Sequence, residues 1–320
     1  MQVLCMGEAL IDMLSNRGQP GIDDNNESFR KFAGGAPANV AVAIAKLGGN
    51  SALLGKLGND QFGHYLMKTL SSFGVATTFT AYSETGKTAL AFVGLDSDGE
   101  RSFEFYIDNA AHTDLHPEDL VPALFDAPRI VSFCSGSVCL PGLRAVTAEA
   151  IPKFKAAGSV LTLDINLRPA FWDDPALAPT TIDDIASQVD IIKASKEEML
   201  ELYGEAEADV KVAHWLSQGV SLVLITNGAA PIAYYSNEAT GSFASPKDVK
   251  AVDTTAAGDA FVGGFLFQLA AQINHRNELT NWLANQNELL RALRFASACG
   301  AHAVSHYGAF DALPTAKDIQ

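Results

Sequence analysis

Apolar runs recur along the chain at a spacing that predicts a parallel sheet. The runs typical of buried strands cover residues 3–6, 129–134, 159–165, 189–193 and 221–226. The stretches between them are long enough for a helix. This alternation predicts βαβ units, and therefore an α/β fold with a mainly parallel central sheet.

Two regions, residues 13–32 and 77–108, depart from this rhythm. The first is rich in Asn, Asp and Gly. The second contains a β-rich run at 88–93, a polar turn at 96–100 and a second run at 101–106, which together predict a hairpin. We expect the two regions to form a small β-sheet lid. The alternative is an edge hairpin of the main sheet.

A polar, Asn-rich segment at 273–289 lies between two apolar helical patterns and predicts a surface excursion. The chain has no evident internal repeat or long linker, so we expect residues 1–320 to form one domain with its lid. An apolar face on the lid would favour pairing with a second copy, which predicts a homodimer through the lid.

Composition excludes several classes of partner. The 320 residues are 48% hydrophobic, enough for a sizeable core, and carry 22 Lys plus Arg against 37 Asp plus Glu, a net charge of −15. This charge disfavours nucleic acids and anionic membranes. No run approaches the roughly 20 apolar residues of a membrane span, and acidic residues soon interrupt the apolar start of the chain, unlike a signal sequence. The four cysteines have neither zinc-like nor dense disulfide spacing, so we expect a cytoplasmic protein.

The stretch Asp253-Thr254-Thr255-Ala256-Ala257-Gly258-Asp259 precedes an apolar helix. Its small residues let several backbone N–H groups converge at a helix N-terminus, where a phosphate is the natural occupant. Asp259 could take a proton from a hydroxyl that attacks this phosphate. The alternative is an ordinary N-cap followed by a turn glycine.

Near the N-terminus, Asp12 follows the first predicted strand, and Gly34, Gly35 and Asn39 lead into a helix. A carboxylate and an amide can together bind vicinal hydroxyl groups, since the carboxylate accepts and the amide both accepts and donates. The diglycine offers a hinge or a close approach to a ligand. The alternative is a helix start with routine capping.

Later predicted strands also end in polar residues. Asn166 and Arg168 follow one strand, and a guanidinium suits a transferring phosphoryl group. After the next strand, Lys193 and Ser195 could face phosphate, while Glu198 could hold the water shell of Mg²⁺. Ser195 and Glu198 also match a capping box, and both interpretations can hold at once.

Thr226 and Gly228 end a further strand with a turn suited to nucleotide contact. Taken in order, these pieces resemble the ribokinase-like family of sugar and nucleoside kinases over nearly the whole chain. The motifs that carry the resemblance are the diglycine motif at 34–39, Asp-x-Asn-x-Arg at 164–168, a Ser-x-x-Glu form of the Asn-x-x-Glu motif at 195–198, and residues 253–259.

This resemblance implies a three-layer core and an ATP-dependent kinase. Asp259 would be the general base for a primary hydroxyl of the sugar, and the backbone N–H groups of Ala256, Ala257, Gly258 and Asp259 would form the anion hole. Arg168 would lie near the transferring phosphate.

The remaining positions follow from the same resemblance, together with the chemistry above. Sugar binding falls to Asp12, Gly34, Gly35, Asn39, Arg168 and Asp259. Nucleotide binding falls to Asn166, Lys193, Ser195, Thr226, Gly228, Ala257 and Gly258. Mg²⁺ would come with ATP and be held through water by Glu198, and a monovalent cation such as K⁺ would bind beside Asp253, Thr255, Ala303 and Gly308.

Ala256 departs from the family pattern, which has glycine there. If the position needed a positive φ, the Cβ would cost roughly 1 to 2 kcal/mol, so we expect Ala256 to have an ordinary backbone conformation. The alanine form is similar to kinases of ketodeoxygluconate, an acidic sugar.

Other segments favour a different substrate. Residues 35–41, 88–93 and 98–103 resemble the bacterial fructokinase branch, and Ile107 stands where many relatives, including acid-sugar kinases, have arginine. The absence of this positively charged side chain weakens the case for a carboxylate-bearing substrate, because a buried unpaired carboxylate is costly. D-fructose is therefore the first candidate, with ketodeoxygluconate and aminoimidazole riboside as alternatives.

Two alternatives belong to other functional classes. A non-catalytic sugar sensor would be free to lose Asp259, which this chain keeps. A dinucleotide-dependent oxidoreductase would need a Gly-x-Gly-x-x-Gly turn after the first strand, and the chain lacks it.

Overall fold

The computed structural model describes residues 1–16, 26–95, 101–247 and 249–319. Their strands form a nine-stranded sheet in the order β13-β12-β11-β10-β9-β8-β1-β4-β5 and a four-stranded sheet in the order β3-β2-β6-β7. All pairs from β10-β11 through to β4-β5 in the large sheet are parallel. The predicted α/β fold with a mainly parallel sheet is confirmed.

The strands are β1 (Gln2–Met6), β2 (Leu10–Ser15), β3 (Phe29–Gly34), β4 (Ser51–Gly58), β5 (Thr80–Ser83), β6 (Leu90–Leu95), β7 (Arg101–Tyr106), β8 (Arg129–Cys134), β9 (Val160–Asp164), β10 (Ile191–Ser195), β11 (Leu222–Asn227), β12 (Ala230–Ser236) and β13 (Thr240–Phe243). The α-helices are α1 (Ala36–Lys46), α2 (Gln61–Ser72), α3 (Pro141–Ala156), α4 (Ala178–Ala186), α5 (Lys196–Ser217), α6 (Ala257–Gln272), α7 (Leu279–Ala284) and α8 (Gln286–Val304). Short 3-10 helices occur at Ala111–Asp114, Pro117–Asp119, Pro122–Leu124, Ser135–Ser137, Pro169–Phe171, Pro175–Leu177, Arg276–Glu278 and Phe310–Ala312.

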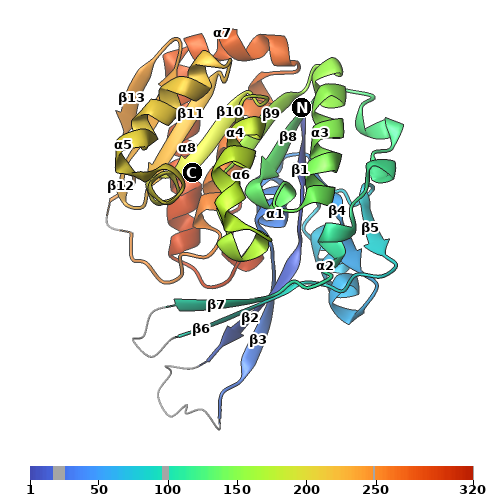
Figure 1. Cartoon of the computed structure of the whole chain (residues 1–320). Helices are drawn as coiled ribbons and strands as arrows, with labels where there is room; N and C mark the ends of the chain where they lie inside the picture. The colour runs from blue at the N-terminus through green and yellow to red at the C-terminus, as the bar shows by residue number, and fades with distance from the viewer. Residues whose placement is uncertain (17–25, 96–100, 248, 320) are drawn as a thin grey trace.

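Alternation along each parallel strand explains the three layers (Figure 1). In β1, Val3 and Cys5 pack into one hydrophobic cluster with residues of α1, α2, α6, α7 and α8. Leu4 and Met6 point the other way, into a cluster with residues of α3, α4 and α5. Because successive side chains of a strand face opposite sides, an uninterrupted apolar strand must be covered on both faces. The helices provide this cover.

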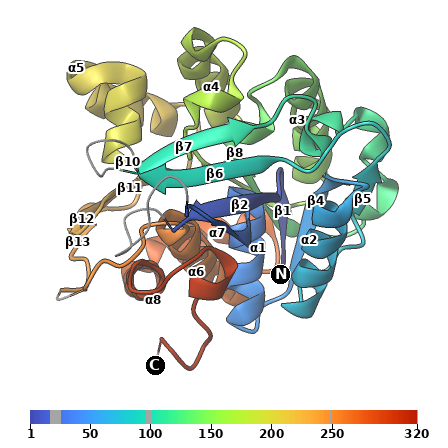
Figure 2. The ribbon, with the colours of Figure 1, turned by 90° about the horizontal axis from the view of Figure 1, so that it is seen from below.

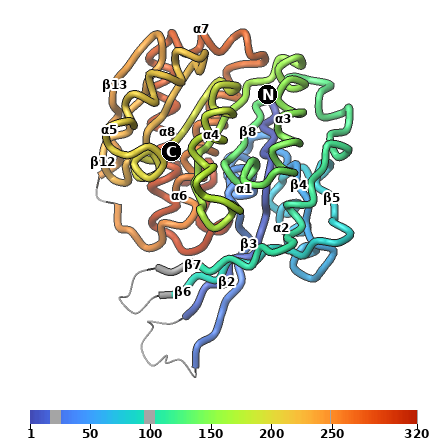
Figure 3. Tube along the Cα trace, viewed as in Figure 1, coloured from blue at the N-terminus to red at the C-terminus, as the bar shows by residue number. Residues whose placement is uncertain are grey.

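The four-stranded sheet lies below the large sheet in Figure 1, and Figure 2 shows β2, β6 and β7 in front of the core when the molecule is seen from below. The β6-β7 pair is antiparallel, as the hairpin pattern predicts, whereas the turn at 96–100 lies outside the described residues, as do 17–25 of the first lid segment. The tube in Figure 3 follows β2-β3 and β6-β7 away from the core.

Aromatic side chains gather on the small sheet. The Phe92 ring lies 5.2 Å from that of Phe29 and 5.1 Å from that of Tyr106, centroid to centroid. Phe29 is 42% exposed and Tyr106 is 56% exposed. An apolar patch therefore reaches solvent on the small sheet.

Several boundaries differ from the sequence-based expectations. β5 lies within the predicted lid region 77–108 but pairs with β4 in the large sheet. Most of the segment 273–289, predicted to be a surface excursion, is helical. Leu279, Trp282 and Leu283 of α7 are buried against the core. No helix among the described residues is long and apolar enough to span a membrane.

Candidate active site

Asp259 lies in the first turn of α6 and is 6% exposed. Asn39 Nδ2 donates to its Oδ2 at 2.7 Å, and Asn166 Nδ2 donates to its Oδ1 at 3.1 Å. Burial raises the pKa of Asp259, while the Asn39 hydrogen bond and the charges of Arg168 and Lys193 oppose this rise. Two amides from distant segments thus fix the orientation of a carboxylate at a helix N-terminus, where the backbone dipoles favour negative charge.

Ala256 immediately precedes α6 and has a left-handed conformation, with φ 58° and ψ 9°. The expectation of an ordinary backbone conformation is therefore wrong. The turn needs the left-handed residue so that the chain can enter the helix, and the Cβ costs about 1 to 2 kcal/mol. Strain of this kind persists where the surrounding structure fixes the backbone.

The backbone N–H groups predicted to form an anion hole belong to this turn. Inside a helix, the first N–H groups have no partner four residues earlier, so they are free to face a ligand. The N–H of Ala257 instead donates to the Thr254 carbonyl at 3.3 Å, whereas the Ala260 N–H makes the helical bond to Ala256 at 2.8 Å. Gly258 and Asp259 are therefore the residues of the turn best placed to offer N–H groups.

The diglycine at the start of α1 allows two close approaches. A Cβ on Gly34 would overlap Oδ2 of Asp12, which lies in β2. Gly35 has φ 100°, and a Cβ there would lie 2.8 Å from the Glu8 carbonyl oxygen. The glycines thus bring Asp12 and the start of α1 together. The Asn39 N–H donates to the Gly35 carbonyl at 2.7 Å, and Asn39 Oδ1 is buried and has no hydrogen-bond partner among the described groups.

Two acids in this region are buried. Glu8 is 5% exposed and Asp12 is 9% exposed. Burial raises the pKa of each to about 7, with the charge of Asp259 adding to the rise and that of Arg168 opposing it. Groups that donate hydrogen bonds, such as sugar hydroxyls, would relieve the cost of ionising them. Sequence reasoning found Asp12 but passed over Glu8.

Gly258 also lines a cavity of about 450 Å³. It is lined by Lys193, Ser195, Thr226, Gly228, Ala257 and Gly258, among others, which are six of the seven residues predicted to bind nucleotide. The seventh, Asn166, is not among the lining residues and bonds to Asp259 instead. Its φ of 38° turns the chain at that point.

Ser297 of α8 also lines this cavity, and sequence reasoning missed it. The residue is 6% exposed, and its hydroxyl has no hydrogen-bond partner among the described groups. A serine in an apolar helix gives no sequence signal of its own, because only the cavity distinguishes it from a packing residue. An unpaired buried hydroxyl is costly and indicates a missing polar partner.

Glu198 fulfils the capping-box interpretation. Its Oε2 accepts from the Ser195 N–H at 2.7 Å, and Ser195 Oγ accepts from the Glu198 N–H at 3.0 Å. Its Oε1 accepts from the Leu167 N–H at 3.1 Å, which joins the 164–168 and 195–198 motifs. A carboxylate retains further lone pairs after these bonds, so Glu198 can still accept from water.

The candidate residues for a monovalent cation meet around Asp253, which is 2% exposed. Its Oδ1 accepts from the Thr255 N–H at 2.8 Å, and its Oδ2 accepts from the Gly308 N–H at 3.1 Å. The Ala303 carbonyl accepts from the His306 N–H at 3.1 Å. Hydrogen bonds thus join Asp253 to Thr255 and to Gly308. Ala303, the fourth candidate, lies in α8, a few residues before Gly308 in the sequence.

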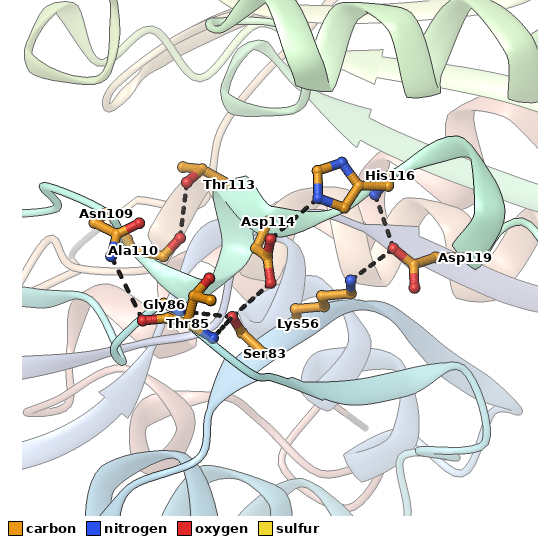
Figure 4. A network of polar contacts seen from close by, with 10 residues as sticks. All are labelled: Lys56, Ser83, Thr85, Gly86, Asn109, Ala110, Thr113, Asp114, His116 and Asp119. Atoms are coloured by element: carbon orange, nitrogen blue, oxygen red, sulfur yellow. Dashed lines mark hydrogen bonds and ion pairs between the residues drawn. The ribbon is translucent and has the colours of Figure 1, made fainter.

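A polar network fixes the base of the β6-β7 hairpin (Figure 4). Ser83, at the end of β5, donates to Asp114 Oδ2 at 2.6 Å, and His116 Nε2 lies 3.1 Å from Asp114 Oδ1. Lys56 of β4 pairs with Asp119 at 2.8 Å. These contacts tie the edge of the large sheet to the segment that follows β7.

Comparison with known proteins agrees with this geometry. Residues 1–316 match the pfkB family of carbohydrate kinases. The chain belongs to this family. Fructokinase-2 from Solanum habrochaites is 37% identical over 317 residues, covering 99% of this chain and 94% of that protein.

Solved structures extend the likeness to three dimensions. A fructokinase from Xylella fastidiosa with bound ATP has a TM-score of 0.90 and 39% identity, over 99% of this chain and 96% of the other. A fructokinase from Vibrio cholerae O395 in a form with fructose, ADP and calcium ion bound has a TM-score of 0.86 and 32% identity, over 99% and 97% of the two chains. The enzyme class predicted from the sequence, a carbohydrate kinase, is confirmed.

Proposed function

We propose that this carbohydrate kinase is an ATP-dependent fructokinase, which transfers the γ-phosphoryl group to the primary hydroxyl of D-fructose to give fructose 6-phosphate. The observation that carries the proposal is the position of Asp259. Amides from α1 and from the segment after β9 orient its carboxylate, between a nucleotide-sized cavity and the region of Asp12. The full-length similarity to fructokinases supports the same substrate.

In the proposed reaction, Asp259 accepts the hydroxyl proton while the hydroxyl oxygen forms a bond to the γ-phosphorus. The bond from that phosphorus to the bridging oxygen breaks, and ADP leaves with the electron pair. N–H groups at the first turn of α6 stabilise the charge on the equatorial oxygens. Asp12, Gly34, Gly35 and Asn39 hold the sugar, and the unpaired Asn39 Oδ1 suits a sugar hydroxyl donor.

Mg²⁺ would accompany ATP and lessen the repulsion between its phosphates. The residues fit a metal held through water. No group of three or more His, Cys, Asp or Glu side chains in the described ranges is arranged to hold a metal directly, whereas Glu198 keeps lone pairs for metal-bound water. A monovalent cation such as K⁺ would bind beside Asp253, Thr255, Ala303 and Gly308. Oxygen ligands of this kind suit hard cations.

The small sheet would act as a lid that excludes water from the reaction. Its exposed aromatic patch, with Phe29 and Tyr106, supports a homodimer in which a second copy covers the patch. Light scattering should give twice the mass of one chain, and Tyr106→Glu should give a monomer; a wild-type monomer with and without sugar would reject the pairing. We place the protein in the cytoplasm, in keeping with its four free, buried cysteines.

The acids near the sugar also favour fructose over ketodeoxygluconate. Glu8 and Asp12 are buried acids, and Ile107 packs against the core where a cation would be needed. A carboxylate-bearing sugar would face repulsion there without a matching positive charge.

Sugar-dependent ADP release tests the proposal. Purified protein with ATP and Mg²⁺ should release ADP fastest with D-fructose, compared with ketodeoxygluconate, ribose and aminoimidazole riboside, and little without sugar. Faster turnover with another of these sugars would replace fructose as the substrate. Sugar binding without any turnover would favour a sensor.

A further inference from the structure

A buried ammonium group lies beside the first turn of α6. A Cβ added to Gly258 would lie 3.3 Å from Lys193 Nζ. Lys193 is 8% exposed and stands in β10, and it lines the same cavity as Gly258. Its positive charge therefore adds to the partial positive charge of the helix N-terminus, at the place where the transferring phosphoryl group is expected.

Asp164 holds this ammonium group in position. Asp164 and Lys193 are register partners on the neighbouring strands β9 and β10. Lys193 Nζ lies 2.9 Å from Asp164 Oδ1, and the carboxylate has no other hydrogen-bond partner among the described groups. The carboxylate, only 5% exposed, thus depends on the charge of Lys193.

The charge state of the lysine fits this role. Burial lowers the pKa of Lys193, but Asp164, Glu198 and Asp259 outweigh burial and raise it above the ordinary value. Burial raises the pKa of Asp164 to about 6, while Lys193 opposes the rise. The pair is therefore ionised near neutral pH.

Arg168, which the sequence suggested for the phosphoryl group, is placed differently. Its side chain is exposed, and Nη1 donates to the carbonyl of Leu167 at 2.8 Å. Lys193 lies beside the helix N-terminus and lines the cavity, whereas Arg168 is not among the residues that line it.

Resting on the proposed kinase function, we propose that Lys193 neutralises the transferring phosphoryl group and that Asp164 is the positioning residue that holds Lys193 there. The ammonium keeps its protons throughout. The hydroxyl proton goes to Asp259, the new bond joins the hydroxyl oxygen to the γ-phosphorus, and the bridging bond breaks to release ADP. Asp164 is not among the residues that line the nucleotide cavity.

Lys193→Met, Asp164→Asn and the double variant test this assignment, with Lys196→Met as the control, because Lys196 is exposed in the first turn of α5. Lys193→Met should lower kcat about 10²-fold, as for loss of one group that stabilises transition-state charge, and Asp164→Asn about 10-fold. Because Asp164 acts through Lys193, Asp164→Asn should cost little more in the Lys193→Met background. An equal loss in both backgrounds would overturn the positioning role.

The pH profile separates positioning from a structural role. Without Asp164 the pKa of Lys193 should fall, so kcat of Asp164→Asn should begin to decline at a lower alkaline pH than wild-type kcat. Identical alkaline limbs in both proteins would reject the ion pair as the functional link.

A binding measurement keeps this inference separate from the choice of substrate. Calorimetry with ATP and ADP should show that Lys193→Met loses most of the preference for ATP, since the ammonium faces the γ-phosphate, while Lys196→Met keeps it. This result does not depend on turnover. If Lys193→Met kept the preference for ATP over ADP, the role of Lys193 would be contradicted. If only the fructokinase proposal were wrong, wild type would still prefer ATP but would release no ADP with fructose.

Discussion

At the proposed phosphoryl end of the site, Lys193 is buried beside the first turn of α6 and paired with Asp164. At the proposed sugar end, Glu8 and Asp12 are buried acids, and burial raises the pKa of each to about 7. The phosphoryl end thus holds positive charge ready for an anion. The sugar end holds acceptors that lack enough positive charge around them. The difference teaches that one end suits an anion such as phosphate and the other suits hydroxyl donors, in keeping with the proposed role of Asp259.

Asp259→Asn should give the largest effect, because Asp259 serves both ends. Loss of a general base typically lowers the rate about 10²- to 10⁴-fold, and kcat should fall within that range. ATP affinity, measured by calorimetry, should change little. Asp311→Asn, at an exposed position, is the matched control. Near-native turnover of Asp259→Asn would remove this residue from the base role.

Glu8→Gln examines the sugar end through stability. The folded-state pKa of Glu8, about 7, exceeds its ordinary value of 4.5, so the folded protein binds more protons between these values. Wild-type stability should therefore fall as pH rises from about 4.5 to 7. Glu8→Gln should not show the loss of stability that ionisation of Glu8 causes, so it should be more stable than wild type at pH 8.

Denaturant unfolding across this pH range measures the effect. Glu118→Gln, at an exposed position, should keep the wild-type slope. If Glu8→Gln and wild type showed parallel stability curves, burial of Glu8 would not have the electrostatic cost inferred for the sugar end.

Ser297→Ala sharpens the comparison from the nucleotide side. Losing one neutral hydrogen bond costs about 0.5 to 1.5 kcal/mol, so KM for ATP should rise about 2- to 10-fold while kcat and KM for fructose stay unchanged. Ser305→Ala is the control, because its hydroxyl donates to the His302 carbonyl at 2.8 Å outside the cavity. An unchanged KM for ATP would mean that the nucleotide does not use the Ser297 hydroxyl.

Ala256→Gly should have the smallest effect. Relief of the left-handed strain at Ala256 is worth about 1 to 2 kcal/mol, and the added freedom of the unfolded chain returns part of it. The free energy of unfolding should rise by about 0.5 to 1 kcal/mol, with kcat nearly unchanged because the backbone N–H remains. Ala298→Gly, inside α8, should instead lower the free energy of unfolding by about 0.5 to 1 kcal/mol. A loss of stability in Ala256→Gly would contradict the strain.

The sequence predicts the large sheet well where strands are continuously apolar. β1, β8, β9, β10 and β11 read directly from such runs, since both faces of a central parallel strand are covered. The added strands β4, β5, β12 and β13 were not predicted. β12 and β13 pair antiparallel at one edge, and β13 has only four residues, too few to give a clear strand signal.

Residue types also predict the site better than backbone conformation does. Six of the seven nucleotide candidates line one cavity, and Asp259 follows two of them, Ala257 and Gly258, in α6. The left-handed φ of Ala256 and the turn of Asn166 toward Asp259 could not be predicted, because neither residue type prefers that geometry strongly enough to reveal it. The roles of Asp164, Glu8 and Ser297 depend on burial and on neighbours distant in sequence, which no local pattern records.

The position of the new phosphate ester tests the central claim most directly. Phosphorus and carbon NMR of the product made from ATP and D-fructose should place the phosphoryl group on the C6 oxygen, with one ADP formed for each sugar phosphate. The account predicts this product with wild type and at least 10²-fold less of it per unit time with Asp259→Asn. Free phosphate without sugar phosphate, or an ester at another carbon, would contradict the account.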